Sequence, residues 1–284
     1  MNNTRVFLVI CFLLVVLGAG AADSGTVPAA GAGKESAVQV GPGVSLVMKQ
    51  VARTVPPVKG AGKDALPGEV ELRYPELTCT SGDHPAVAVI NKAMKTRMLS
   101  MFEDKQPGSP EQLADLFLQD YERSFAEAPE SIGGWFLKFQ TTVKHADEEL
   151  LCLETLDSVF TGGAHPNSAI SYLVFSLKTG EPLPLTAFVP EARTADLTKV
   201  AEAHFRKARE MKPGETFEQA GFNFEQNRFA LNQNFLVSKA GLAFCFNPYE
   251  IGPYAMGTTE LLIPWSDLKG IADAAGPAGR FLKP

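Results

Sequence analysis

The chain has 284 residues, a formal net charge of −6 and 45% hydrophobic residues. This length and apolar content suffice for one large domain or two small ones with a proper core. Lys and Arg are scattered without a basic run or stripe, so the composition argues against a nucleic acid as partner.

The first 21 residues have the three parts of a secretory signal peptide. Arg5 is their only charge, residues 6–17 form an apolar run of 12 residues, and Ala19-Gly20-Ala21 is an Ala-x-Ala cleavage site. The run is shorter than the roughly 20 residues that span a bilayer as a helix. We therefore expect an exported protein, periplasmic or extracellular after cleavage near Ala21, with no membrane span in the mature chain. An uncleaved membrane anchor is the alternative that remains open.

The mature chain begins with a segment of low complexity. Residues 22–43 are rich in Ala, Gly, Ser and Pro, a composition that predicts a flexible leader. A strand at residues 44–55 is compatible with the pattern, and prolines and glycines then predict a loop up to residue 68. We therefore treat residues 22–68 as leader and loop, and expect continuous structure from residue 69.

The next segment predicts one strand and two helices. Residues 70–80 predict a strand broken by Pro75. Ser109 followed by Pro110 predicts the start of the second helix. The first helix has apolar residues at helical spacing, and we interpret its methionine stripe as core rather than as a metal or cofactor site. That stripe consists of Val87, Ile90, Met94, Met98 and Met101.

The remaining elements are mostly strands that lie next to each other in sequence. Because strands and helices are mixed without βαβ alternation, the sequence predicts an α+β fold with a mainly antiparallel sheet, packed helices and two sequential subdomains. We place the subdomains at residues 69–160 and 161–284. The predicted strands are 135–143, 149–160, 169–177, two on either side of residues 239–241, and 258–263, with helices at 197–208 and from 264.

Three cysteines remain after cleavage: Cys79, Cys152 and Cys245. In an oxidising compartment two of them can pair, with Cys79 and Cys152 slightly favoured because both lie in the first half, but the sequence decides neither the pairing nor whether a disulfide forms. No pair has Cys-x-x-Cys spacing, so no zinc ribbon and no redox motif is predicted.

The common catalytic motifs are absent from the sequence, which has no phosphate-binding loop, dinucleotide fingerprint, His-Glu-x-x-His or Gly-x-Ser-x-Gly. We predict no cofactor and no metal. Of the four histidines, His84 and His145 are expected in solvated loops, and His204 on the apolar face of a helix.

The fourth histidine, His165, lies in an unusual loop. Gly162 and Gly163 permit positive φ, and Pro166 keeps His165 out of the α region. Such a loop can present the His165 imidazole and the Asn167 amide to a ligand. The alternative is a tight connection between strands, whose side chains only bond the unpaired backbone.

A second loop, residues 247–257, contains two prolines, two tyrosines and two glycines. Its Tyr249, Glu250 and Tyr254 are candidate binding residues, because tyrosine offers a large contact area at low entropic cost. Tyrosine hydroxyls can equally well tie a loop to the core.

These two loops resemble a known family. Residues 157–167 with 175–180 resemble the start of the carboxy-terminal domain of RsiV-type anti-sigma factors, and residues 235–257 resemble its end. The part from about residue 70, with Tyr74-Pro75 and Ile90-Asn91, is similar to the companion domain found beside it and in PdaC-type deacetylases. The resemblance covers roughly residues 70–268.

The resemblance implies binding rather than catalysis. The extracellular part of the anti-sigma members is a lysozyme receptor, and catalysis in the deacetylases belongs to a separate metal-dependent domain. This chain has no sigma-binding segment before its apolar stretch and no paired Asp with His-x-x-x-His. Signalling and deacetylation are therefore not expected here.

We expect a non-enzymatic cell-envelope binding module whose ligand is a lysozyme-like protein or peptidoglycan. The alternative is a cell-wall hydrolase that uses His165 and a nearby carboxylate. Glu154, Asp157, Glu250 and Glu260 could form a glycosidase-like pair of carboxylates, but the sequence does not establish their separation. In a third interpretation both loops only complete the fold. The oligomeric state is not predicted.

Overall fold

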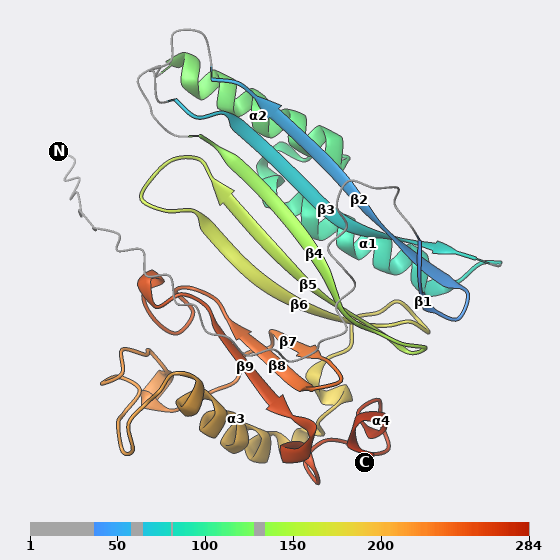
Figure 1. Cartoon of the computed structure of the whole chain (residues 1–284), viewed down its shortest axis with the longest axis vertical. Helices are drawn as coiled ribbons and strands as arrows, with labels where there is room; N and C mark the ends of the chain where they lie inside the picture. The colour runs from blue at the N-terminus through green and yellow to red at the C-terminus, as the bar shows by residue number, and fades with distance from the viewer. Residues whose placement is uncertain (1–36, 58–64, 81, 128–133, 284) are drawn as a thin grey trace.

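The protein is described by a computed structural model covering residues 37–57, 65–80, 82–127 and 134–283. The signal peptide and the leader up to residue 36 lie outside these residues. A six-stranded sheet in the order β1-β2-β3-β4-β5-β6 is antiparallel throughout, except that β3 pairs with β4 in parallel (Figure 1). The expected α+β fold is thereby confirmed. The strands are β1 (Val38–Gly41), β2 (Val44–Val55), β3 (Gly68–Cys79), β4 (Phe136–Ala146), β5 (Leu150–Phe160) and β6 (Asn167–Ser176).

The end of the expected flexible leader is a strand. Residues 38–41 form β1, which pairs with β2 through a two-residue turn in which Gly43 has a φ of +70°. Val40 is buried against the core of the first half of the chain. This contact supplies the apolar burial that composition alone did not predict for the segment.

Two helices between β3 and β4 cover one face of the large sheet: α1 (Pro85–Leu99) and α2 (Pro110–Glu127). They provide the long crossover that a parallel strand pair requires. Ile90, Met94 and Met98 are buried, so the methionine stripe belongs to the core as predicted. The Ser109 hydroxyl accepts a hydrogen bond from the Gln112 backbone N–H at 3.1 Å and caps α2.

The C-terminal half covers part of the opposite face of the large sheet (Figure 1). Alternation along β5 shows this two-sided packing, because Leu151 and Leu153 belong to the helix-side core whereas Leu150 and Cys152 belong to the other core. The expected subdomain boundary, between residues 160 and 161, falls in the loop joining β5 to β6. Strand β6 follows that boundary and completes the same sheet. The C-terminal half contains β7 (Phe235–Val237), β8 (Gly241–Phe246), β9 (Thr259–Pro264), α3 (Thr194–Ala208) and α4 (Gly279–Leu282).

Pro75 lies inside β3 and does not break it. Strand β4 pairs with β3 only as far as Arg73. At Pro75, β3 therefore has a neighbouring strand on one side only, where its partner is Met48 of β2. A proline is tolerated where no second strand needs its N–H. Past this point the Asn91 side chain of α1 replaces the missing strand: its Oδ1 accepts from the Leu77 N–H at 2.8 Å, and its Nδ2 donates to the Leu77 carbonyl at 2.9 Å.

The short helix α4 is tied to the turn between β4 and β5. Arg280 Nη1 donates to both carboxylate oxygens of Asp147 at 3.1 Å, and His145 Nε2 lies 2.8 Å from Asp147 Oδ2. The His145 ring also packs edge-on against Phe281. The expectation that His145 is solvated was wrong: it is 8% exposed, because β4 continues past a bulge and carries it into this contact.

Cys79, Cys152 and Cys245 are all free thiols, and burial raises the pKa of Cys152 to about 12. Within the described ranges, no helix has the length and apolar character needed to cross a membrane.

Replacing Asn91 tests the role of its side-chain amide at the end of β3. Asn91→Ala leaves the N–H and C=O of buried Leu77 without partners, and we expect the free energy of unfolding to fall by about 1–3 kcal/mol. Urea denaturation measures this change. Asn223→Ala at an exposed position is the control and should stay within about 0.5 kcal/mol. Equal effects of the two changes would contradict the role assigned to Asn91.

The Asp147 carboxylate makes the stability of the protein depend on acidic pH. Burial works to raise its pKa, but bonds from the Glu149 and Leu150 N–H groups, His145 and Arg280 lower it below the usual value. The ionised form therefore stabilises the fold above the ordinary pKa of about 4 and ceases to do so as the pH falls below it.

We accordingly expect Asp147→Asn to be less stable than the wild type at neutral pH, and the difference to shrink as the pH falls below about 4. Denaturation curves measured between neutral pH and about pH 3 check this. Asp115→Asn, at an exposed position on α2, is measured at each pH as the control for loss of a surface carboxylate. A pH-independent difference for Asp147→Asn would refute the assignment.

Candidate functional site

The two predicted loops, which are far apart in sequence, meet in the structure. One joins β5 to β6 and the other joins β8 to β9. His165 of the first loop stacks on Tyr254 of the second, with ring centroids 3.7 Å apart and planes inclined by 12°. His165 Nε2 lies 3.1 Å from the Tyr249 hydroxyl, and the Tyr249 and Tyr254 rings are 5.7 Å apart. We call His165, Tyr249 and Tyr254 the aromatic cluster.

The backbone fixes the tautomer of neutral His165. Its Nδ1 lies 2.9 Å from the Pro166 carbonyl oxygen, which can only accept a hydrogen bond. Nδ1 therefore carries the proton, and Nε2 accepts from the Tyr249 hydroxyl. Among the described residues, no carboxylate lies within ion-pair distance of His165.

Tyr249 combines exposure with an unfavourable backbone conformation. Its side chain is 65% exposed, and its φ of +69° lies in the left-handed region. This region costs a residue with a Cβ about 1–2 kcal/mol and favours glycine or asparagine. Neither burial nor backbone preference therefore accounts for a tyrosine here.

The other predicted residues of the first loop do not contact the cluster. Gly162 and Gly163 have φ values of +100° and +107°, and a Cβ at either position would meet no atom within 4 Å. These glycines serve the turn and not a close approach of backbone. Asn167 is exposed and begins β6, where it pairs with Val159. Its side chain makes no hydrogen bond within the described part of the chain.

Glu250 has a structural role next to the cluster. Its Oε2 accepts from the Asn247 N–H at 2.9 Å, and its Oε1 accepts from Asn232 Nδ2 at 2.7 Å. The Asn247 side chain in turn satisfies the free edge of β6: Oδ1 accepts from the Ile170 N–H at 2.7 Å, and Nδ2 donates to the Ile170 carbonyl at 2.9 Å. These bonds hold the second loop against the large sheet.

Asn234 extends this edge contact, and the sequence did not reveal it. Its Oδ1 accepts from the Tyr172 N–H at 2.7 Å, and its Nδ2 donates to the carbonyls of Ile170 and Cys245 at 2.9 Å each. The only signal in the sequence is an asparagine directly before β7, which is a weak one.

The candidate acids do not converge on His165. The Tyr172 hydroxyl donates to Glu260 at 3.3 Å, and burial, followed by Glu260, raises the pKa of Tyr172. Asp157 is on the opposite face, where it pairs with Arg97 of α1. Burial raises the pKa of Asp157 despite that arginine. A catalytic acid beside His165 is therefore not formed by these residues.

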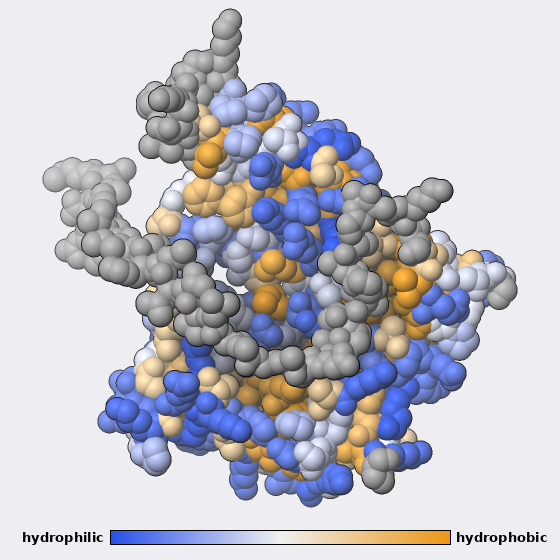
Figure 2. Space-filling view, viewed as in Figure 1, coloured by the Kyte–Doolittle hydropathy of each residue, from blue (hydrophilic) through white to orange (hydrophobic). Residues whose placement is uncertain are grey.

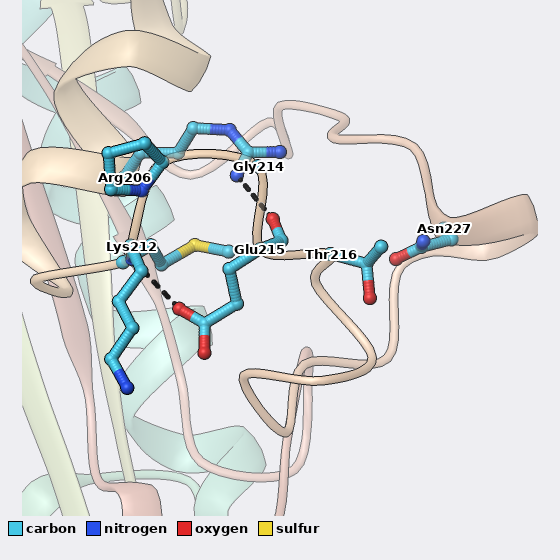
Figure 3. A pocket seen from close by; sticks show the side chains of 8 residues that line it. Arg206, Lys212, Gly214, Glu215, Thr216 and Asn227 are labelled. Atoms are coloured by element: carbon cyan, nitrogen blue, oxygen red, sulfur yellow. Dashed lines mark hydrogen bonds between the residues drawn. The ribbon is translucent and has the colours of Figure 1, made fainter.

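A surface hollow of about 470 Å³ lies in the loop after α3 (Figure 3). Arg206 donates to the Glu215 carbonyl, and the Glu215 side chain accepts from the Lys212 backbone N–H, both at 2.8 Å. The hollow is open to solvent and contains no residue of the two predicted loops. No cluster of His, Cys, Asp and Glu suited to a metal ion occurs in the described ranges.

The free energy of unfolding of variants separates the residues of the second loop that hold the fold from those that are only exposed. We expect Tyr249→Asn to keep or raise the free energy of unfolding, by up to about 1 kcal/mol, because asparagine tolerates the left-handed conformation. Asn247→Ala should lower it by about 1–3 kcal/mol, because the Ile170 N–H loses its partner, although the Ile170 carbonyl keeps its bond from Asn234. Denaturation of both variants checks this. If Tyr249→Asn lowered the free energy of unfolding as much as Asn247→Ala does, Tyr249 would be a residue that stabilises the fold.

Three comparisons place the chain among known proteins. Residues 188–266 match the family model "Protein of unknown function (DUF3298)". A crystal structure of a DUF3298 member from Bacteroides fragilis NCTC 9343 is similar, with a TM-score of 0.66 and 20% identity over 84% of this chain and 97% of that one. A crystal structure of a DUF3298 protein from Pseudomonas aeruginosa PAO1 is also similar, with a TM-score of 0.56 and 19% identity over 80% of this chain and 94% of that one. No curated protein matches.

These identities show a common fold and not a common activity, and the resemblance to RsiV-type and PdaC-type proteins stays a prediction. Residues 188–266 of the chain therefore match the DUF3298 model, and the chain has the fold of the two solved DUF3298 proteins.

Proposed function

We propose that the protein is an exported, non-catalytic binding module of the cell envelope, and that the aromatic cluster is its recognition surface. The observation that carries this proposal is Tyr249, a bulky side chain that is exposed and held in a left-handed conformation. Unfavourable backbone conformations persist where the rest of the structure imposes them, and they gather at ligand-contacting sites. An exposed tyrosine at such a position, with its ring beside those of His165 and Tyr254, supports a role in contact with a ligand.

The shape and chemistry of the cluster favour binding over hydrolysis. A hydrolase would need His165 beside a carboxylate in a cleft. The polar partners of His165 are the Tyr249 hydroxyl and the Pro166 carbonyl, and Glu250 bonds to asparagines instead. Stacked, half-exposed rings suit recognition of a protein or of a cell-wall glycan, since each ring combines apolar area with a polar group.

The first test is retention on the immobilised mature protein, residues 22–284. Lysozyme and purified peptidoglycan fragments are passed over the wild type, Tyr249→Asn and Leu66→Asn. The last variant is a matched control, because Leu66 is an exposed apolar residue of the first half of the chain. We expect saturable retention of one ligand, weakened about tenfold or more by Tyr249→Asn and unaffected by Leu66→Asn.

Retention that is equal in all three proteins would place the binding surface elsewhere. Failure of the wild type to retain either ligand would refute the proposed function for these two ligand classes. The structural role of Asn247 would stand in both cases, because it depends on stability measurements alone.

A further inference from the structure

Strand β2 has an edge without a partner strand along most of its length. Strand β1 pairs with β2 only at residues 44–46, whereas β2 continues to Val55 (Figure 1). In the part of the chain that the structure describes, no backbone group on this side of β2 bonds to another backbone group beyond Leu46. Unpaired N–H and C=O groups along a strand edge can pair with a further strand.

The ladder shows which backbone groups point outward from this edge. The Thr80 N–H donates to the Gly43 carbonyl at 2.9 Å, so these residues form a hydrogen-bonded pair at the end of the β2–β3 ladder. Such pairs recur at every second residue of an antiparallel ladder, so the even-numbered residues of β2 point away from β3. Those without a partner strand, which we call the β2 edge, are Met48, Gln50, Ala52 and Thr54.

A surface hollow of about 240 Å³ lies beside the end of the β2 edge, between β2 and α2. Buried Leu118 contributes apolar surface to it, and exposed Asp115 and Glu122 contribute carboxylates. Neither carboxylate forms an ion pair with a residue of the described ranges. Arg53 is the one cation in the lining, and its Nη1 donates to the Ala52 carbonyl at 3.0 Å. Two carboxylates and one guanidinium leave the hollow with a net negative charge.

Alternation along the strand directs side chains of an added strand into this hollow. Val51 belongs to the helix-side core, so the side chains of Arg53 and Val55 also lie on the side of α2. Residues opposite Arg53 and Val55 in an added antiparallel strand point to that same side, while their neighbours bond to the β2 edge. A long basic side chain at such a position can lay its aliphatic stem on Leu118 and bring its charge to a carboxylate.

We propose that the β2 edge binds an extended, basic segment of a partner protein, which adds to the sheet as a strand and places a lysine or arginine side chain in the hollow. The main chain of the segment supplies affinity, and the side chain in the hollow supplies specificity. Figure 2 shows mostly hydrophilic residues in the upper part of the molecule, where β2 and α2 lie in Figure 1, which suits a charged partner. The proposal involves no residue of the aromatic cluster and does not rest on the function proposed above.

A second copy of the chain matches the β2 edge less well than a basic segment does. Antiparallel pairing of two β2 strands continues the sheet and places both α2 helices on the same face of it. The carboxylates of Asp115 and Glu122 from both copies would then line one gap, where like charges repel. A basic partner is attracted by the same carboxylates that repel a copy.

The probe is a fluorescent peptide of alternating threonine and lysine, about eight residues long so that it can cover residues 48–55. Fluorescence anisotropy follows its binding to the mature protein, residues 22–284. One comparison peptide has glutamate in place of lysine. The other carries a methyl group on the backbone nitrogen of each threonine, because the threonines bond to the β2 edge when the lysines point toward the hollow. We expect both to bind at least about tenfold more weakly than the lysine peptide.

Variants test the two parts of the site separately. Asp115→Asn combined with Glu122→Gln should weaken binding of the lysine peptide by about two- to tenfold. Glu218→Gln combined with Glu225→Gln removes two exposed carboxylates of the C-terminal half, and this control should bind like the wild type. Gln50→Pro removes an outward N–H and leaves the bonds to β3 in place, so binding should weaken by about two- to tenfold.

Equal binding of the lysine peptide and its methylated form would show attraction by charge alone and would overturn the inference. Binding unchanged by Asp115→Asn with Glu122→Gln, or no saturable binding of the lysine peptide, would also overturn it. Sedimentation of the protein alone adds a further test, because a dimer that Gln50→Pro dissociates would make a second copy the occupant of the β2 edge. Thermal denaturation checks the fold of each variant, and if Gln50→Pro does not fold, the methylated peptide and the carboxylate variants decide.

Discussion

The hydrogen bonds that satisfy the free edge of β6 determine how the two halves of the protein fit together. An unpaired sheet edge presents N–H and C=O groups that pair with any available strand. Here the side chains of Asn234 and Asn247 form hydrogen bonds with these backbone groups at Ile170 and Tyr172. Because an amide carries one acceptor and two donors, it can replace a strand residue locally without extending the sheet. The position of the second loop against His165 follows from this contact, and Asn91 serves the end of β3 in the same way.

Local patterns predicted most of the secondary structure, because alternation and helical spacing are properties of neighbouring residues. The methionine stripe of α1, the cap of α2 and the hairpin of β4 and β5 follow from such patterns. What the patterns missed depends on contacts between distant residues. Pro75 was expected to break a strand that in fact lacks a second neighbour there, and β1 is ordered by burial of Val40. The burial of His145 depends on Arg280 and Phe281, more than 130 residues away.

The candidate site shows the same limit. Both loops were identified from their composition, and the structure brings His165, Tyr249 and Tyr254 into one cluster. The division of labour among the remaining residues could not be predicted, because sequence does not show which side chains face the backbone of another strand. Glu250 looks like a binding residue in the sequence and is a structural one in space. Phe136 and Phe160 look like ordinary strand residues, and only their register places two rings together on an open face.

The contact between Arg280 and Asp147 also bears on how the protein reaches its fold. It joins residues 133 positions apart, and it connects a turn of the first half to the end of the second. Contacts of such long range slow folding, because the loop they close must be ordered first. A chain that emerges from its amino end can form the β4–β5 turn through the local bonds of Asp147 to Glu149 and Leu150, but gains the Arg280 contact only when residue 280 is present. The contact between α4 and this turn is therefore among the last to form as the chain is synthesised.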